Sequence, residues 1–311
     1  MDSSAGAYPL RPMNISEIID AVFRLYRANL WLFAAVAAVI QIPYQLLLTF
    51  VQGQSGSLSR ALSSLPSGAR NSHHVQLLFL TYWHGSGLAV LALALFGLLA
   101  LPLDLAAMTS AGAERYQGRP TSLQLAFQVA RRRWLPLMGV FLLMILILIG
   151  AIFALAIAGT LLTVVLKALG VLLLVLLCLT AVTAGIIASV RLIVTIPVVV
   201  LEPAGPLQAM QRSWSLIRGH SWFVIGVVLV LTLIVGFSGL VLGVIAGLLA
   251  ALAGGVATVP GHVITAATSL VISVLFAPVT SLGVMLLYFN LRGRKEGSEL
   301  GPTVGQPALG V

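Results

Sequence analysis

Long stretches without a charged side chain constrain the fold of this chain more than any other feature. Leu30–Val51 and Trp134–Leu166 are uncharged throughout, and Ala168–Val200 is interrupted only by Arg191. About 20 apolar residues in a helix, rising about 1.5 Å per residue, cross the ~30 Å hydrocarbon layer of a bilayer. Charged residues make up 8% of the chain, whereas a soluble domain has about 25%. We therefore expect lipid, rather than water, to surround most of the protein.

Six apolar stretches predict six membrane-spanning helices. The predicted spans are Leu30–Val51, Leu88–Gly112, Trp134–Leu166, Ala168–Val200, Trp222–Ala250 and Val263–Leu291. Between the first two, Gln52–Gln76 is rich in Ser and Gly and predicts a loop, and Leu77–Trp83 is interpreted as a short interfacial segment. The predicted fold class is an all-α polytopic membrane protein with six transmembrane helices in three hairpins, each preceded by a cytoplasmic-face amphipathic helix. The corresponding units are a disordered lead (1–13), three helix-plus-hairpin units (14–112, 113–200 and 201–291) and a cytoplasmic tail (292–311).

Three similar amphipathic segments precede spans, at Glu17–Trp31, Pro120–Trp134 and Gln208–Trp222. In each, apolar residues fall on one face at the helical period and charged or amide residues fall on the other. Such a helix is typical of the membrane interface. When Glu17–Trp31 is aligned with Gln208–Trp222, Arg27 matches Arg218 and Trp31 matches Trp222. This match favours a unit repeated three times, although any cytoplasmic segment that enters a membrane tends to carry Arg and Trp. The predicted interfacial anchors are Trp31, Trp134, Trp214 and Trp222.

Positive charge is distributed unevenly about the predicted spans. The net charge is +9, and most Lys and Arg residues outside the spans fall on one side, against Arg60, Arg70 and Lys167 on the other. Cytoplasmic loops of membrane proteins collect basic residues, so both termini are predicted to be cytoplasmic. The same excess attracts anionic lipid headgroups and requires no nucleic acid. The predicted headgroup-binding residues are Arg24, Arg27, Arg131, Arg132, Arg133, Arg212, Arg218, Arg292, Arg294 and Lys295, and Glu202 is a candidate partner for Arg212.

Asp104 and Arg191 are the ionisable residues within predicted spans. Each lies about ten residues, or roughly 15 Å, from the cytoplasmic end of its helix. An unpaired charge at that depth is costly, so the sequence predicts that the two form an intramembrane ion pair. The pair has two interpretations: it locks the second span to the fourth, or it forms part of a gate or binding group.

Other small and polar residues allow weaker predictions. Gly239, Gly243 and Gly247 recur every four residues and favour close helix packing, within the chain or between two copies. His73, His74, His84 and His262 map to the outer face without a carboxylate or Cys partner, so neither a metal site nor a cofactor is predicted. The single cysteine, Cys178, excludes an intrachain disulfide. The last span is rich in hydroxyl groups, interpreted as interhelical hydrogen bonds or as the lining of a solute path.

Three segments carry a resemblance to a known family: RPMNISEIIDAVFRLYRANLWLF, VVLEPAGPLQAMQRSWSLIRGHSW and YFNLRGRKEG. With them, the chain resembles the bacterial glycerophosphodiester phosphodiesterase membrane-domain family and its standalone relatives. The resemblance implies a six-helix protein of the bacterial plasma membrane. A phosphodiesterase of that type needs metal-binding carboxylates and a His pair. Arg218-Gly219-His220 does not provide that pattern, so no catalytic residue is predicted.

Three functions remain open from the sequence, none of them enzymatic. The first is a protein that organises, senses or moves membrane lipids or amphiphilic solutes. The second is a channel or secondary transporter that uses Asp104 and Arg191. The third is a membrane scaffold for a separate enzyme, with a homo-oligomer or a protein partner as further possibilities. A cavity that reaches Asp104 favours the second, and a lateral opening toward lipid favours the first.

Overall fold

The fold is entirely helical over the residues that the structure, a computed structural model, describes. These are 13–63, 72–256 and 258–300, with side chains described for 13–53, 87–167, 169–256 and 258–296. The helices are α1 (Ile15–Ala28), α2 (Leu30–Ser63), α3 (Ser72–Tyr116), α4 (Leu123–Arg132), α5 (Trp134–Leu192), α6 (Thr195–Leu201), α7 (Pro206–Ile217), α8 (Ser221–Leu252) and α9 (Val259–Leu300).

Six helical segments are long and apolar enough to cross a membrane, as predicted. They are Leu30–Gly53, Gly87–Tyr116, Trp134–Lys167, Leu169–Leu201, Ser221–Leu252 and Val259–Glu296. The predicted turn at Lys167 is present: its φ of 48° and ψ of −119° interrupt α5 and reverse the chain. Gly170 completes this turn, because a Cβ atom there would lie 1.9 Å from the carbonyl oxygen of Leu162.

The structure differs from the predicted elements at two places, a loop and a span. The loop predicted over Gln52–Gln76 is shorter, because α2 continues to Ser63 and α3 starts at Ser72. Ser and Gly disfavour a helix only weakly, and tertiary context overrides such propensities. The fourth span, predicted over Ala168–Val200, is present as Leu169–Leu201, but it is interrupted, since α5 ends at Leu192 and α6 follows. Pro197 explains this break, because it has no N–H to donate to the carbonyl of Ile193.

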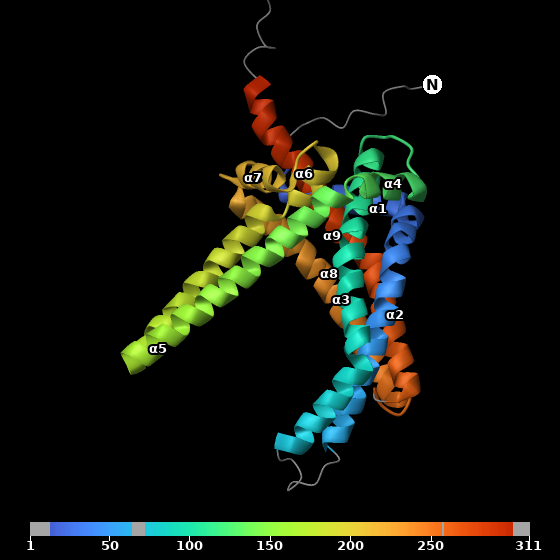
Figure 1. Cartoon of the computed structure of the whole chain (residues 1–311). Coiled ribbons are helices and arrows are strands. Elements are labelled where there is room, and N and C mark those ends of the chain that lie inside the picture. Colours follow the sequence, from blue (N-terminus) through green and yellow to red (C-terminus); the bar gives the residue numbers. More distant parts are fainter. Residues whose placement is uncertain (1–12, 64–71, 257, 301–311) are drawn as a thin grey trace, which may run out of the picture.

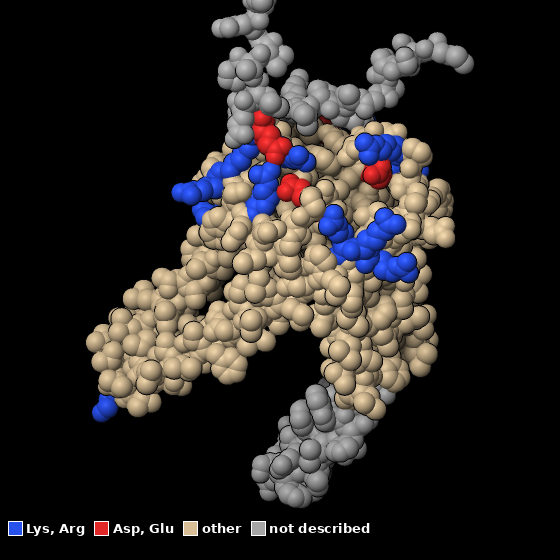
Figure 2. Space-filling view, turned by 45° about the horizontal axis from the view of Figure 1, so that its top comes forward, with Lys and Arg blue, Asp and Glu red and all other residues tan. Residues whose placement is uncertain are grey.

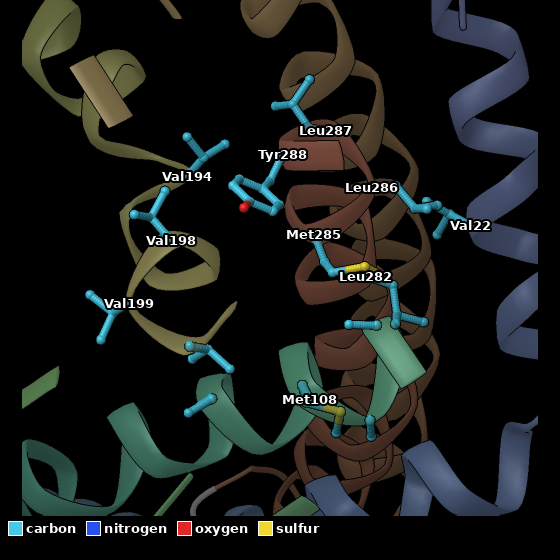
Figure 3. Packing of buried hydrophobic residues seen from close by; sticks show 14 of the residues in the cluster. Val22, Met108, Val194, Val198, Val199, Leu282, Met285, Leu286, Leu287 and Tyr288 are labelled. Atoms are coloured by element: carbon cyan, nitrogen blue, oxygen red, sulfur yellow. The ribbon is translucent and has the colours of Figure 1, made fainter. Parts of the chain in front are cut away.

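One end of the molecule gathers α1, α4, α6, α7 and the last turns of α9 (Figure 1). We call it the polar end. Helix α1 starts here with a capping box, in which the Asn14 side chain accepts from the Glu17 N–H at 2.9 Å and the Asn14 N–H donates to Glu17 at 2.8 Å. The apolar side of α1 contacts α9 and α8, with Val22 facing Leu286 (Figure 3). Protein, and not only lipid, therefore covers this side of α1.

Helix α9 is the centre of the core. Its buried residues Leu282, Met285 and Tyr288 face Met108 of α3 and the valines of α6 (Figure 3). The close approach of α3 requires a glycine, because a Cβ atom on Gly112 would lie 2.5 Å from a methyl group of Leu282. The core therefore joins α9 to elements from both halves of the chain.

The two antiparallel halves of α5, called the α5 hairpin, stand apart from the other spans (Figure 1). The space-filling view shows an open hollow between this hairpin and the rest of the molecule (Figure 2). At the polar end the hairpin contacts α7 and α3. There Gly139 lies against Pro206, whose ring would be 2.5 Å from a Cβ atom at position 139. The hairpin is thus attached at one end only.

Candidate functional site

Lysine and arginine side chains gather at the polar end (Figure 2). Two of them, Arg212 and Arg292, take part in a polar network with Glu202, Tyr288 and Glu296. The Nε atom of Arg212 lies 3.5 Å from Glu202, and Arg212 also pairs with Glu296. Arg292 donates to Glu296 at 2.6 Å, and the Tyr288 hydroxyl donates to Glu202 at 2.7 Å. The network therefore connects the α6–α7 junction to the end of α9.

Two further cations also have intramolecular partners. Arg294 donates to the Asn290 side chain at 2.8 Å and to the Met13 carbonyl at 2.7 Å, and its guanidinium lies 4.4 Å from the Phe223 ring centre. Lys295 donates to the carbonyl of Ser215. Arg212, Arg292, Arg294 and Lys295, all predicted to bind headgroups, thus fasten α7, α8, α9 and the start of α1 together. The pairing of Arg212 with Glu202 was predicted and is present. The carbonyl partners of Arg294 and Lys295 could not be predicted, because the sequence does not show which carbonyls lie nearby.

The other predicted headgroup residues are more available. Arg24, Arg27, Arg131, Arg132 and Arg218 are exposed. Arg133 is half-buried at the junction of α4 and α5, where its backbone N–H donates to the last carbonyls of α4. The arginines at positions 131 to 133 therefore lie where the α5 hairpin leaves the polar end. Their binding to headgroups stays a prediction.

A cavity of about 450 Å³ lies at the polar end between α3, α4, α6 and α9. Its charged lining residues are Glu114, Arg119 and Arg292, and its apolar ones include Val200 and Phe289. Glu114 and Arg119 form an exposed ion pair at 3.8 Å, which contributes at most about 1 kcal/mol. Asp104 is not among the lining residues. This cavity therefore does not provide a path to the buried carboxylate.

Asp104 and Arg191 have different partners in the structure, instead of forming the predicted ion pair. Asp104 is 4% exposed and accepts a hydrogen bond from the Gln41 side chain at 3.0 Å. The Arg191 guanidinium lies over the Trp214 ring, 4.5 Å from its centre. An aromatic face offsets part of the cost of a partly buried cation, and the break before α6 brings α7, with Trp214, against the end of α5. Charge matching in the sequence does not identify Gln41 or Trp214 as partners, although a glutamine within a predicted span is a signal for such a role.

Gly239, Gly243 and Gly247 do not pack closely against another helix of the chain, which was the arrangement favoured from the sequence. A Cβ atom on Gly243 or Gly247 would meet no heavy atom within 4 Å, and one on Gly239 would meet only Ile272, at 3.8 Å. The side of α8 that carries these glycines thus faces outward.

The four predicted tryptophan anchors lie in different surroundings. Trp31 and Trp222 are highly exposed. Trp214 lies under Arg191, and Trp134 donates to the Leu99 carbonyl of α3 at 3.4 Å.

Three hydroxyl side chains of the last span donate within their own helix. Thr265 donates to the Gly261 carbonyl at 3.0 Å, Ser273 to Leu270 at 2.9 Å and Ser281 to Ala277 at 3.3 Å. For these three residues the interhelical bonds favoured from the sequence are replaced by bonds to the preceding turn.

No group of three potential metal ligands occurs among the described residues. The side chains of His73, His74 and His84 lie outside them.

Comparison with known proteins identifies one family. Residues 167–297 match the family model of the membrane domain of glycerophosphoryl diester phosphodiesterase. The resemblance seen in the sequence is confirmed over this segment. The matched membrane domain runs from the Lys167 turn to the residue after Glu296, so it contains the whole polar network. The resemblance of the opening segment lies outside the match, and no curated protein and no solved structure matches the chain.

Proposed function

We propose that this integral membrane protein interacts with lipids: acyl chains enter the hollow beside the α5 hairpin, and anionic headgroups lie at its polar end. The proposed role is non-enzymatic. The proposed location is a bacterial plasma membrane, with both termini in the cytoplasm. The single observation that carries it is the hairpin standing apart from the other spans (Figures 1 and 2).

Both halves of the α5 hairpin expose apolar side chains almost everywhere. No residue in the most apolar part of Leu169–Leu201 is buried, and few are buried in Trp134–Lys167. Exposed residues along it include Leu146, Phe153 and Leu179. In a bilayer, acyl chains cover such side chains, and they also fill a hollow that opens sideways. The hollow therefore suits the apolar part of an amphiphile.

The base of the hairpin carries exposed positive charge. Arg131 and Arg132 end α4, directly before α5 begins at Trp134. Each Lys or Arg close to an anionic membrane surface contributes about 1 kcal/mol of attraction. Cations at the base and apolar walls beside it match the two parts of an anionic lipid.

The test compares lipids retained by two double variants of equal charge. Arg131→Gln with Arg132→Gln and Arg119→Gln with Lys167→Gln each lower the net charge from +9 to +7. Purified protein is equilibrated with vesicles of equal phosphatidylglycerol and phosphatidylcholine content, and the bound lipids are counted by native mass spectrometry. The first variant is expected to lose about 2 kcal/mol of preference for phosphatidylglycerol, on the order of tenfold or more.

The second variant is the control, because Arg119 is paired with Glu114 and Lys167 lies at the far end of the hairpin. It is expected to retain the wild-type lipid ratio. If both variants lose the same preference for phosphatidylglycerol, the preference depends on the net charge of the protein and not on Arg131 and Arg132. A wild-type protein that retains both lipids equally would exclude an anionic headgroup site.

A further inference from the structure

A stripe of polar side chains runs along one side of α2, half-buried at Gln41, Gln45 and Thr49 and exposed at Gln52. Gln41, Gln45, Thr49 and Gln52 follow one another at intervals of three or four residues, so they lie on one face of the helix. Gln45, Thr49 and Gln52 line a cavity of about 140 Å³ together with residues of α9. We call this cavity the vestibule. It lies in the half of the span far from the polar end.

The opposite wall of the vestibule is also polar. His262, Thr265 and Ser269 of α9 line it, at the three- and four-residue spacing of one helix face. A polar cavity of this size has room for water, which needs polar partners to remain inside a protein. The vestibule therefore suits water, although apolar spans surround it.

The inner end of the stripe meets a buried acid. Gln41 lies one helical turn, or about 6 Å, beyond Gln45, and its amide donates to Oδ2 of Asp104. The other carboxyl oxygen, Oδ1, is buried and has no hydrogen-bond partner among the described residues. A carboxylate with one amide donor at this depth carries an uncompensated charge, which is costly in a membrane.

Charged groups on the surrounding helices do not neutralise Asp104. No described residue forms an ion pair with it, and Arg191 is stacked on Trp214. Glu114 and Arg115 of α3, Arg131 of α4 and Arg292 of α9 lie toward the polar end, and Glu114 is about 15 Å along the helix from Asp104. The titratable side chain that lines the vestibule is His262. A proton on Oδ1 would remove the charge and leave Oδ2 free to accept from Gln41.

We propose that Asp104, held by Gln41, is a proton-binding site inside the membrane that exchanges its proton with water in the vestibule between α2 and α9. The step is an acid–base equilibrium: a hydronium ion gives its proton to Oδ1 and becomes water, and the reverse step returns the proton to water. No covalent bond other than O–H forms or breaks. This site is independent of lipid binding beside α5, so either proposal can fail without the other.

The first experiment asks whether Asp104 carries a proton. Protein in nanodiscs is treated with the apolar reagent dicyclohexylcarbodiimide, which reacts with protonated carboxyl groups, and modified residues are found by mass spectrometry. Modification is expected at Asp104 and is expected to disappear in Asp104→Asn, which keeps the shape of the side chain. Asp20→Asn, which changes an exposed acid on α1, is the control and is expected to be modified at Asp104 like the wild type.

An infrared spectrum of the wild type makes the test independent of how the variants fold. The carbonyl band of a buried carboxylic acid is expected at neutral pH, and it is expected to be missing in Asp104→Asn. A wild type without that band, or without modification at Asp104, would overturn the proposal.

The second experiment asks whether the proton exchanges through the vestibule. After transfer to heavy water, the acid band shifts as deuterium replaces the proton. Gln45→Leu places an apolar side chain between the vestibule and Gln41 and is expected to slow this shift severalfold. Leu46→Ala, on the exposed side of α2, is expected to exchange at the wild-type rate. Equal rates in wild type and Gln45→Leu would overturn the vestibule route.

Discussion

Tyr288 is the residue through which the core of the protein meets its charged end. Its ring is 0% exposed against Met285 and the valines of α6, while its hydroxyl donates to Glu202 and lies 3.4 Å from Arg292. A hydrogen bond to a charged group contributes more than one between neutral groups. The position therefore favours tyrosine over phenylalanine, although a buried apolar site by itself would accept either.

Replacing Tyr288 with Phe is expected to lower the free energy of unfolding by about 1–2 kcal/mol, since Glu202 loses one donor but keeps Arg212. Thermal unfolding in detergent measures the change. Tyr44→Phe is the control, because Tyr44 of α2 lies outside the polar network. A loss of the same size in Tyr44→Phe would show that the network adds nothing to stability.

Sequence reasoning locates the charged residues and pairs some of them correctly: Glu202 lies beside Arg212 as predicted. The predicted pairing of Asp104 with Arg191 is not formed. Asp104, predicted to lie within an apolar span, is buried in α3. Its partner, Gln41, comes from another helix and is uncharged, so charge matching could not identify it. The sequence also does not reveal that Arg294 and Lys295 donate to the carbonyls of Met13 and Ser215. The presence of a helix can be predicted from the local pattern of apolar residues. The contacts of a polar side chain depend on how helices that are distant in the sequence pack together.

Among the elements, the contact between α5 and α7 decides how the α5 hairpin is held. Gly139 of α5 touches the ring of Pro206, the first residue of α7. A proline ring cannot rotate away as a longer side chain can. Residue size at position 139 therefore sets the distance between these two helices.

Gly139→Val is expected to destabilise the protein by about 1–3 kcal/mol, the usual cost of overpacking. Thermal unfolding measures the loss. Gly150→Val is the matched control on the same helix, because a Cβ atom there would meet nothing within 4 Å. If both variants unfold at the same temperature, the contact with Pro206 does not restrain the hairpin.

For the whole molecule, the charge distribution predicts one orientation in the membrane. The polar end holds the clustered cations, and Lys167 marks the opposite tip of α5 (Figures 1 and 2). Basic residues favour the cytoplasmic side. The start of α1 and the end of α9 lie at the polar end (Figure 1), so both are predicted to lie on that side.

Cysteine labelling in intact cells tests this orientation. In a Cys178→Ser background, which removes the native thiol, Lys167→Cys is expected to react with an impermeant maleimide added outside. Arg218→Cys is expected to react only after the membrane is opened. The reverse pattern would place the polar end outside the cell.

The length of the α5 hairpin has a consequence for its surroundings. Its first half, Trp134–Lys167, contains 34 residues and is about 50 Å long. Its second half, which ends at Leu192, is about 36 Å long, while the hydrocarbon layer is only ~30 Å thick. A helix with this excess length tilts to keep its apolar surface out of water. A thicker bilayer would let the hairpin stand more upright, swinging it toward its neighbours about the Gly139–Pro206 contact. Bilayer thickness, which differs between membranes, would in this way adjust the width of the hollow.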